Sequence, residues 1–223
     1  MDETKVLAAY EPLFRPKTVA VVGASTKGTA LPNVFIRRIR EFGYDGAIYP
    51  IHPTAQEIDG LPAYKSLGET PEPIDYAYIA IAAAQVPPLL AGSKGRVRFA
   101  QVISSGFGEV DEGKALQEAL AVSARTGGMR LIGPNCLGIY TPRGRVTFAE
   151  IGPREVGEVG VISQSGGLGT DIIRRGLNRG LKYSGLITVG NCADITPTDI
   201  LEFYLADPQT RVIGLYIETA KDG

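Results

Sequence analysis

The stretch that decides the fold reads Gly160-Val161-Ile162-Ser163-Gln164-Ser165-Gly166-Gly167-Leu168-Gly169. An apolar run passes directly into Ser-Gln-Ser-Gly-Gly and then into a helical pattern, which is typical of a buried parallel strand that turns into a helix. Glycines let the backbone approach an anion closely, serines supply hydroxyl donors, and the first N–H groups of the helix point at the same place. The pattern therefore predicts a phosphate-binding turn.

A second strand-to-helix turn of similar character lies far upstream, at Val19-Ala20-Val21-Val22-Gly23-Ala24-Ser25-Thr26-Lys27-Gly28. Its glycines have the spacing G-x-x-x-x-G and not the G-x-G-x-x-G of a dinucleotide fingerprint. The spacing alone leaves open whether this turn binds an anion or only connects a strand to a helix. Two such turns favour a large phosphorylated ligand, or a ligand together with a phosphorylated intermediate.

Strand patterns rich in Val, Ile, Ala and Tyr alternate with helical patterns, which predicts parallel sheets of the α/β class. Because the strands are almost continuously apolar, they fit a sheet that is covered on both faces. In the first part, strands are predicted at 18–22, 47–50, 76–81, 100–103 and 131–133, with helices at 32–42, 86–90 and 111–126. In the second part, strands are predicted at 160–163, 185–189 and 212–217, with helices at 168–180 and 197–206.

A change of rhythm divides the chain into two predicted domains. Thr141-Pro142-Arg143-Gly144 and Ile151-Gly152-Pro153 interrupt the alternation, so residues 1–140 form a first domain, 141–158 a linker and 159–223 a second domain. Three strands and two helices make about half of an ordinary α/β domain. We therefore expect the second domain to be completed by a longer natural chain or by a partner.

Composition excludes several classes of function. The chain has 223 residues, with 23 Lys and Arg against 24 Asp and Glu, so it lacks the basic excess of a nucleic-acid-binding protein. The longest apolar run, Tyr76 to Ala84, is far shorter than the roughly 20 residues of a membrane span. Two cysteines make no disulfide framework and the first residues lack a signal-peptide pattern, so we expect a cytoplasmic protein that binds neither nucleic acid nor membrane.

The exit of the second predicted strand disfavours a nicotinamide dinucleotide. An NAD site places Asp or Glu there, whereas this strand leaves through Tyr49-Pro50-Ile51-His52-Pro53, and Asp45 precedes it. The single histidine, His52, is expected to line the ligand crevice or to bond locally in its loop rather than to act as a catalyst. One histidine and two distant cysteines predict no metal site.

Two further turns are expected at the ligand edge of the first sheet. Ser104-Ser105-Gly106-Phe107-Gly108 follows the fourth strand, and Gly133-Pro134-Asn135-Cys136-Leu137-Gly138 follows the fifth. Each of these turns can also be an ordinary loop without a ligand, and Cys136 can be a buried, unreactive thiol. Glu218 follows the last strand and is either a solvated strand-end carboxylate or an orienting group for a cationic side chain.

Taken together, the motifs resemble the CoA-binding and CoA-ligase segments of NDP-forming acyl-CoA synthetases, in particular the ADP-forming acetyl-CoA synthetase branch, and more distantly the succinyl-CoA synthetase alpha subunit. The motifs that carry the resemblance are Thr18 to Ser25, Ile48 to Pro53, Gly133-Pro134-Asn135-Cys136, Ser163 to Gly167, Gly190-Asn191 with Asp194, and Asp207-Pro208 with Tyr216-Ile217-Glu218. They occur in the order of the family and cover nearly the whole chain.

The resemblance implies a Rossmann-like CoA-binding domain followed by an incomplete flavodoxin-like, succinyl-CoA synthetase-like domain. It places the CoA contacts at Ser25, Thr26, Lys27, Gly28, His52, Pro53, Ser104, Ser105 and Gly106, with Asn135 and Cys136 toward the thiol end. ATP or ADP and Mg²⁺ are expected only in an ATP-grasp part outside this chain, in the same or another polypeptide. Whether the protein forms a homo-oligomer is left open.

The resemblance also implies a reaction in which acid, CoA and ATP give acyl-CoA, ADP and phosphate through a phosphohistidine. Ser165, Gly166 and Gly167 match the turn that holds this phosphate, and Glu218 matches the carboxylate that orients the histidine, so Ser165 and Glu218 are the implied catalytic residues. The histidine itself lies in a segment that this chain lacks, and Thr170 replaces the aromatic residue of succinyl-CoA synthetases, which disfavours succinate among small carboxylic acids. The alternative is a non-catalytic CoA- or acyl-CoA-sensing module like those fused to some protein acetyltransferases; an NAD-dependent oxidoreductase is a remote third.

Overall fold

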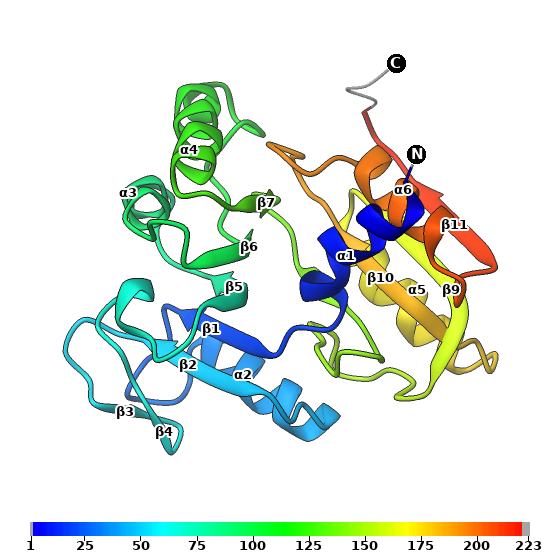
Figure 1. The fold of residues 1–223 in the computed structure, drawn as a ribbon, viewed down its shortest axis with the longest axis horizontal. Coiled ribbons are helices and arrows are strands. Elements are labelled where there is room, and N and C mark those ends of the chain that lie inside the picture. The colour runs from blue at the N-terminus through cyan, green and yellow to red at the C-terminus, as the bar shows by residue number, and fades with distance from the viewer. Residues whose placement is uncertain (1, 220–223) are drawn as a thin grey trace.

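The structure is a computed structural model that describes residues 2–219. It consists of two α/β halves that lie side by side (Figure 1). The first sheet holds β1 (Thr18–Val22), β2 (Ala47–Ile51), β5 (Ile74–Ile79), β6 (Val97–Val102) and β7 (Arg130–Ile132). All of its pairs are parallel, in the order β2-β1-β5-β6-β7. All five predicted strands of this part are present, because each is an apolar run that the fold buries on both faces.

The strand order reverses next to β1, since the chain adds β2 on one side and β5 on the other. Beyond β2 lies a small hairpin of β3 (Glu57–Ile58) and β4 (Leu61–Pro62), which the sequence analysis did not predict. Tyr64 then forms a single parallel bridge with Ile51. With Tyr64 counted as a rudimentary third strand, the sheet has the strand order of a Rossmann fold.

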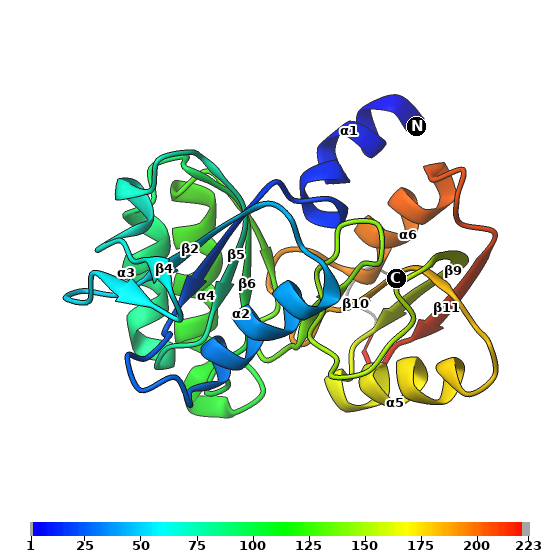
Figure 2. The ribbon, with the colours of Figure 1, turned by 90° about the horizontal axis from the view of Figure 1, so that it is seen from below.

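Helices cover both faces of this sheet (Figure 2). The outer face carries α3 (Val86–Ala91) and α4 (Lys114–Thr126), which pack against one another, while α2 (Leu31–Phe42) lies on the face toward the second half. Short 3-10 turns at Leu67–Glu69, Ala83–Gln85 and Asp111–Gly113 complete the connections. The described residues contain no helix long and apolar enough to cross a membrane.

One helix of the structure was not predicted from the sequence. The helix α1 (Glu3–Phe14) is capped by the Asp2 carboxylate, and it buries only its second half, so it carries little helical periodicity. Its Phe14 ring stacks on Phe203 at 4.0 Å, and Figure 2 shows the helix lying over the junction of the two halves. The same cluster of buried side chains continues from the first sheet to the second, so the halves share a core.

The second sheet has the order β11-β9-β10-β8. Its parallel strands are β9 (Val156–Ser163), β10 (Tyr183–Thr188) and β11 (Val212–Tyr216), and β8 (Gly138–Tyr140) pairs antiparallel to β10. Residues 138–140 were predicted to belong to the first domain and residues 156–158 to the linker, and those domain boundaries stay a prediction. The strand β8 was not predicted because three residues are too few to show a period.

Two helices cover opposite faces of this sheet (Figure 2). They are α5 (Gly166–Leu177) and α6 (Pro197–Ala206), and α6 begins with a capping box between Thr196 and Asp199. The helix α5 begins two residues before its predicted start, because Ser165 caps it. The edge strand β11 stays poorly covered: Val212, Leu215 and Tyr216 are each at least 40% exposed.

Candidate active site

A cavity of about 640 Å³ opens at the carboxyl edge of the first sheet, where the strand order reverses. Ligands of open α/β sheets bind at this point, because the connections from β1 leave in opposite directions and open a crevice. The wall is formed by Val22, Gly23, Ala24, Ser25, Ile51, His52, Pro53, Lys65, Ile81, Ala84, Gln85, Pro88 and Leu89. The cavity thus joins a glycine turn, a cation and an apolar wall from α3.

The first turn follows β1 closely around Gly23. This residue has φ +99°, and a Cβ added there would overlap the carbonyl oxygen of Ala80. Only glycine allows β1 to approach the end of β5 in this way. Ser25 lines the cavity, and Lys27 donates its backbone N–H to the Ser25 hydroxyl at 3.1 Å, so the turn folds back on itself. Thr26, Lys27 and Gly28 continue the same turn outside the cavity wall.

A buried asparagine that the sequence analysis missed fixes this turn. Asn33, in the first turn of α2, accepts the Ser25 N–H at 2.7 Å and donates to the Ser25 carbonyl at 2.9 Å. Its amide also donates to Asp59 at 3.1 Å, and Arg37 donates to the carbonyl of Gly28 at 2.9 Å. The one signal in the sequence is a polar residue on the otherwise apolar inner face of a predicted helix.

The loop after β2 brings His52 and Pro53 to the opposite wall. The His52 Nδ1 accepts the N–H groups of Thr54 at 3.2 Å and Ala55 at 2.9 Å, which is the local bonding that the sequence analysis held open. Because Nδ1 is an acceptor, the other ring nitrogen, Nε2, carries the proton in the neutral ring and can donate to a ligand. Lys65, another residue that the sequence analysis missed, adds a cation beside this wall.

The turn after β6 lies next to this cavity. The Ser104 hydroxyl donates to the carbonyl of Ile81, a cavity residue, at 2.5 Å, while Ser105 and Gly106 are exposed. The Glu109 carboxylate accepts the N–H groups of Gly106 and, at 3.2 Å, Phe107. Partial burial acts to raise the pKa of Glu109, but hydrogen bonds from Asn191 and these N–H groups outweigh it and hold that pKa below its ordinary value.

Asn135 and Cys136 have different exposures although they are neighbours. Asn135 has φ +57° and is exposed, and its N–H donates to the Ser104 carbonyl at 3.0 Å. Cys136 is 3% exposed, and burial raises the pKa of its thiol to about 12. A thiol in this state is a poor nucleophile near neutral pH, so the structure favours the inert alternative for Cys136.

The second half reaches the same region through the loop after β10. The N–H of Asn191 donates to the Pro134 carbonyl at 3.0 Å, and its side chain donates to Glu109 at 2.5 Å. Asp194 binds Arg130 with two hydrogen bonds of 3.2 and 3.0 Å, and accepts the Leu131 N–H at 2.7 Å. The turns after β6, β7 and β10 therefore form one polar seam between the two halves.

The second turn that the sequence predicted to bind phosphate lies at the start of α5. The Ser165 hydroxyl accepts the N–H of Leu168 at 3.3 Å, and Gly167 has open space around the position of a Cβ. A Cβ at Gly166 would come within 2.8 Å of Leu137, the neighbour of Cys136. The helix N-terminus is thus partly open, and its remaining N–H groups favour an anion.

Gln164 is a buried residue whose role the sequence analysis missed. Its Nε2 donates to the Thr219 carbonyl at 2.9 Å, and its Oε1 accepts the N–H groups of Thr219 at 2.8 Å and of Glu218. The amide therefore ties the chain after β11 to the start of α5. Ser165 and Glu218 are brought to the same edge of the sheet by this contact.

The predicted residues fall into three groups in the structure. Ser25, His52 and Pro53 line the cavity, and Ser104, Gly106 and Asn135 lie at the seam. The third group lies at the start of α5 and consists of Ser165, Gly166, Gly167 and Glu218. Within residues 2–219 no group of three or more His, Cys, Asp or Glu side chains is arranged to hold a metal ion. Both predicted turns present N–H groups that favour an anion, and the carboxylate of Glu218 is exposed beside the second turn.

Two family models match the chain. Residues 17–142 match the CoA binding domain, and residues 156–223 match the succinyl-CoA ligase like flavodoxin domain. The first match covers more than half of the chain, and the boundary between them coincides with the connection between β8 and β9.

Curated relatives and solved structures agree with these models. The chain is 42% identical to the acetate–CoA ligase (ADP-forming) I subunit alpha of Pyrococcus furiosus, over 96% of this chain and 48% of the relative, and 33% identical to the 4-hydroxybutyrate–CoA ligase (ADP-forming) of Nitrosopumilus maritimus, over 95% and 31%. It superposes with a TM-score of 0.88, at 36% identity, on the dinucleotide forming acetyl-coenzyme A synthetase 1 of Ca. Korarchaeum cryptofilum in complex with phosphate and ADP, over 96% of this chain and 46% of that one. The chain spans at most about half the length of these relatives.

Proposed function

This chain belongs to the NDP-forming acyl-CoA synthetase family, and from that membership we propose that it is the CoA-binding portion of an ADP-forming acid–CoA ligase. The complete enzyme would convert a small carboxylic acid, CoA and ATP into acyl-CoA, ADP and phosphate. The observation that carries the proposal is the cavity at the strand-order reversal, next to the Gly23 turn.

The cavity and the turn beside it fit CoA. The N–H groups after Gly23, together with Lys27 and Lys65, supply donors and positive charge for the phosphates, and Pro88 and Leu89 supply an apolar wall. His52 would donate from Nε2 to a polar group of the ligand. When bound, CoA would supply the thiol nucleophile, and the exposed Asn135 turn would lie toward that end.

The start of α5 would hold the phosphoryl group that a histidine outside the described residues carries. Ser165, Gly166 and Gly167 would donate to it, and Glu218, held by Gln164, would orient the histidine. A carboxylate beside an imidazole fixes its tautomer and stabilises its positive charge. The exposed apolar residues of β11 fit a sheet that continues with a further strand.

We further propose that an ATP-grasp domain or subunit binds ATP or ADP with Mg²⁺, since relatives occur both as an alpha subunit and as longer chains. A homo-oligomer remains part of the proposal. Both cysteines are free thiols, which fits the reducing cytoplasm.

A calorimetric titration tests the CoA assignment directly. The chain is titrated with CoA, dephospho-CoA and NADH at matched ionic strength. We expect saturable binding of CoA, weaker binding of dephospho-CoA because one phosphate is lost, and none of NADH. Binding of NADH without any response to CoA would contradict the proposal and would favour an oxidoreductase. If CoA binds, adding the ATP-grasp partner and assaying ADP release separates a ligase from a CoA-sensing module.

A further inference from the structure

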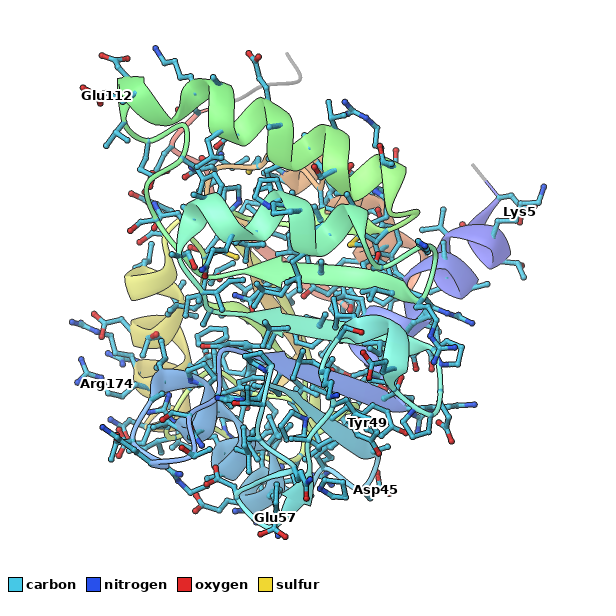
Figure 3. All side chains as sticks on the ribbon, turned by 90° about the vertical axis from the view of Figure 1, so that its left-hand side faces the viewer. Lys5, Asp45, Tyr49, Glu57, Glu112 and Arg174 are labelled. Atoms are coloured by element: carbon cyan, nitrogen blue, oxygen red, sulfur yellow. The ribbon has the colours of Figure 1, made fainter. Side chains whose placement is uncertain are left out.

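A second large cavity, of about 820 Å³, lies at the amino edge of the first sheet, away from the CoA cavity. It is lined by Glu11, Arg15, Pro16, Lys17, Gly43, Asp45, Gly46 and the turn Arg143-Gly144-Arg145. In Figure 3, Asp45 lies on the right, just before β2, and Glu112, in the segment that follows β6, lies on the left. The two cavities therefore open at opposite ends of the strands.

Positive charge exceeds negative charge in this wall. Four cationic side chains line the cavity with two carboxylates, those of Glu11 and Asp45, and a third carboxylate, that of Asp207, pairs with Arg143 without lining the cavity. Glu11 makes a long, exposed ion pair of 3.9 Å with Arg15, which is a weak interaction in water. Within residues 2–219 no carboxylate lies within ion-pair distance of Lys17 or Arg145, so their charges are available to a ligand.

Two buried polar atoms without partners lie at or behind this wall. Three buried side-chain polar atoms of the described residues lack a hydrogen-bond partner: Arg143 Nε, Tyr44 Oη and Arg96 Nε. Arg143 lines the cavity, and the Tyr44 hydroxyl lies behind Gly46, which also lines it. A buried donor without a partner is costly, and negative charge in the cavity would offset part of that cost through space rather than by direct contact.

The shape of the wall selects the kind of anion. Beside the charged residues it offers only glycines and a proline, with no aromatic ring on which a base could stack. Guanidinium groups bind phosphate oxygens in pairs. Both terminal nitrogens of Arg143 already hold Asp207, whereas Arg145 donates to the Arg154 carbonyl at 2.8 Å and pairs with no carboxylate of residues 2–219. Arg145 also has φ +56°. Residues other than glycine seldom adopt this backbone conformation, and those that do are concentrated at binding sites. The wall therefore suits a compact, highly charged ligand.

We propose that this cavity binds a compact oligophosphate, independently of CoA. Its wall comes from three segments: the end of α1 with its connection to β1, the connection from α2 to β2, and the turn of residues 143–145. Arg143 of that turn holds Asp207, at the end of α6, with bonds of 3.2 and 2.5 Å. An oligophosphate bound here joins the two halves of the chain from the side opposite the CoA cavity.

The test is a calorimetric titration of the full chain with inorganic tripolyphosphate, without CoA and again with saturating CoA. We expect one site whose affinity CoA leaves unchanged. Lys17→Gln and Arg145→Asn should each weaken binding by about tenfold, because each removes one charge from the wall. Asn is chosen at 145 because it tolerates positive φ. The matched control is Arg174→Gln, which removes an exposed charge from α5.

Each result bears on the proposal. Retained affinity in the control, with loss in the two cavity variants, supports the site. Absence of saturable binding overturns it, and so does equal weakening in Arg174→Gln, which indicates unspecific attraction. Competition by CoA also overturns it, because the tripolyphosphate would then lie in the CoA cavity. If CoA does not bind, the titration of tripolyphosphate without CoA still tests this cavity. The proposal for CoA and the proposal for oligophosphate can therefore be rejected independently.

Discussion

Gly190 lies directly against the carbonyl oxygen of Pro134, across the seam between the two halves. Its φ is +52°, and a Cβ at this position would overlap both that oxygen and the carbonyl oxygen of Asn135. The contact lets the N–H of Asn191 reach the same Pro134 carbonyl at 3.0 Å. One residue without a side chain thus sets how closely the second half approaches the turn after β7.

Gly190→Ala should destabilise the chain by about 2–4 kcal/mol, because it adds a steric overlap to an unfavourable backbone conformation. The control is Gly180→Ala, which has φ +71° but open space, and should cost about 1–2 kcal/mol. Urea unfolding followed by circular dichroism measures both. Equal losses in the two variants would mean that the close approach to Pro134 contributes nothing.

Arg130→Met should destabilise the chain by about 1–3 kcal/mol, because it leaves the half-buried carboxylates of Asp194 and Asp199 without their cation. Arg211→Gln removes an exposed pair of 3.8 Å with Glu158 and should change stability by less than about 0.5 kcal/mol. Thermal unfolding of the two variants provides the comparison. If Arg130→Met behaves like the exposed control, the seam is not held by this network.

Lys27→Glu should weaken CoA binding by roughly tenfold at low salt, because it places a negative charge beside the phosphates. The loss should become smaller as salt is added, since salt screens exposed charges. Lys182→Glu makes the same charge change on an exposed site of the second half and serves as the control. Unchanged CoA affinity in Lys27→Glu, measured by calorimetry, would count against the first-turn site.

Ser165→Asp should leave CoA affinity nearly unchanged, because the start of α5 is assigned to a phosphoryl group and not to CoA. Asp can also cap the helix as Ser165 does, so the fold should persist. The same calorimetric titration is the measurement. A loss as large as that of Lys27→Glu would merge the two anion sites into one.

Cys136 should make stability depend on pH above neutrality. Its pKa is raised to about 12 by burial, from an ordinary value of 9.0, so the folded chain keeps a proton that the unfolded chain releases. This contribution is fully present below pH 9 and is lost as the pH rises from 9 to 12. Buried tyrosines add a loss of the same sign, so the measurement is the difference from Cys136→Ser, which should lose less stability over this interval. Equal slopes would show that the thiol ionises normally.

The apolar strands were predictable because burial on both faces leaves a continuous hydrophobic run in the sequence. The turns at Gly23 and Ser165 were predictable because glycine and a capping serine act locally. The helix α1 was not predicted, because its burial depends on contacts such as that of Phe14 with Phe203, nearly 190 residues away. The strand β8 and the β3–β4 hairpin were not predicted either, because they are too short to show a period.

The sequence by itself determined the α/β class, the positions of the two glycine-containing strand-to-helix turns and the resemblance to a ligase family, because these follow from local patterns and their order. Only the tertiary structure decided which turns share a cavity, that Asn33 fixes the first turn, and that Gln164 brings Glu218 to the start of α5. The physical reason is distance along the chain. A hydrogen bond between residues more than 50 positions apart, such as that of Gln164 with Thr219, leaves no periodic signal in the sequence.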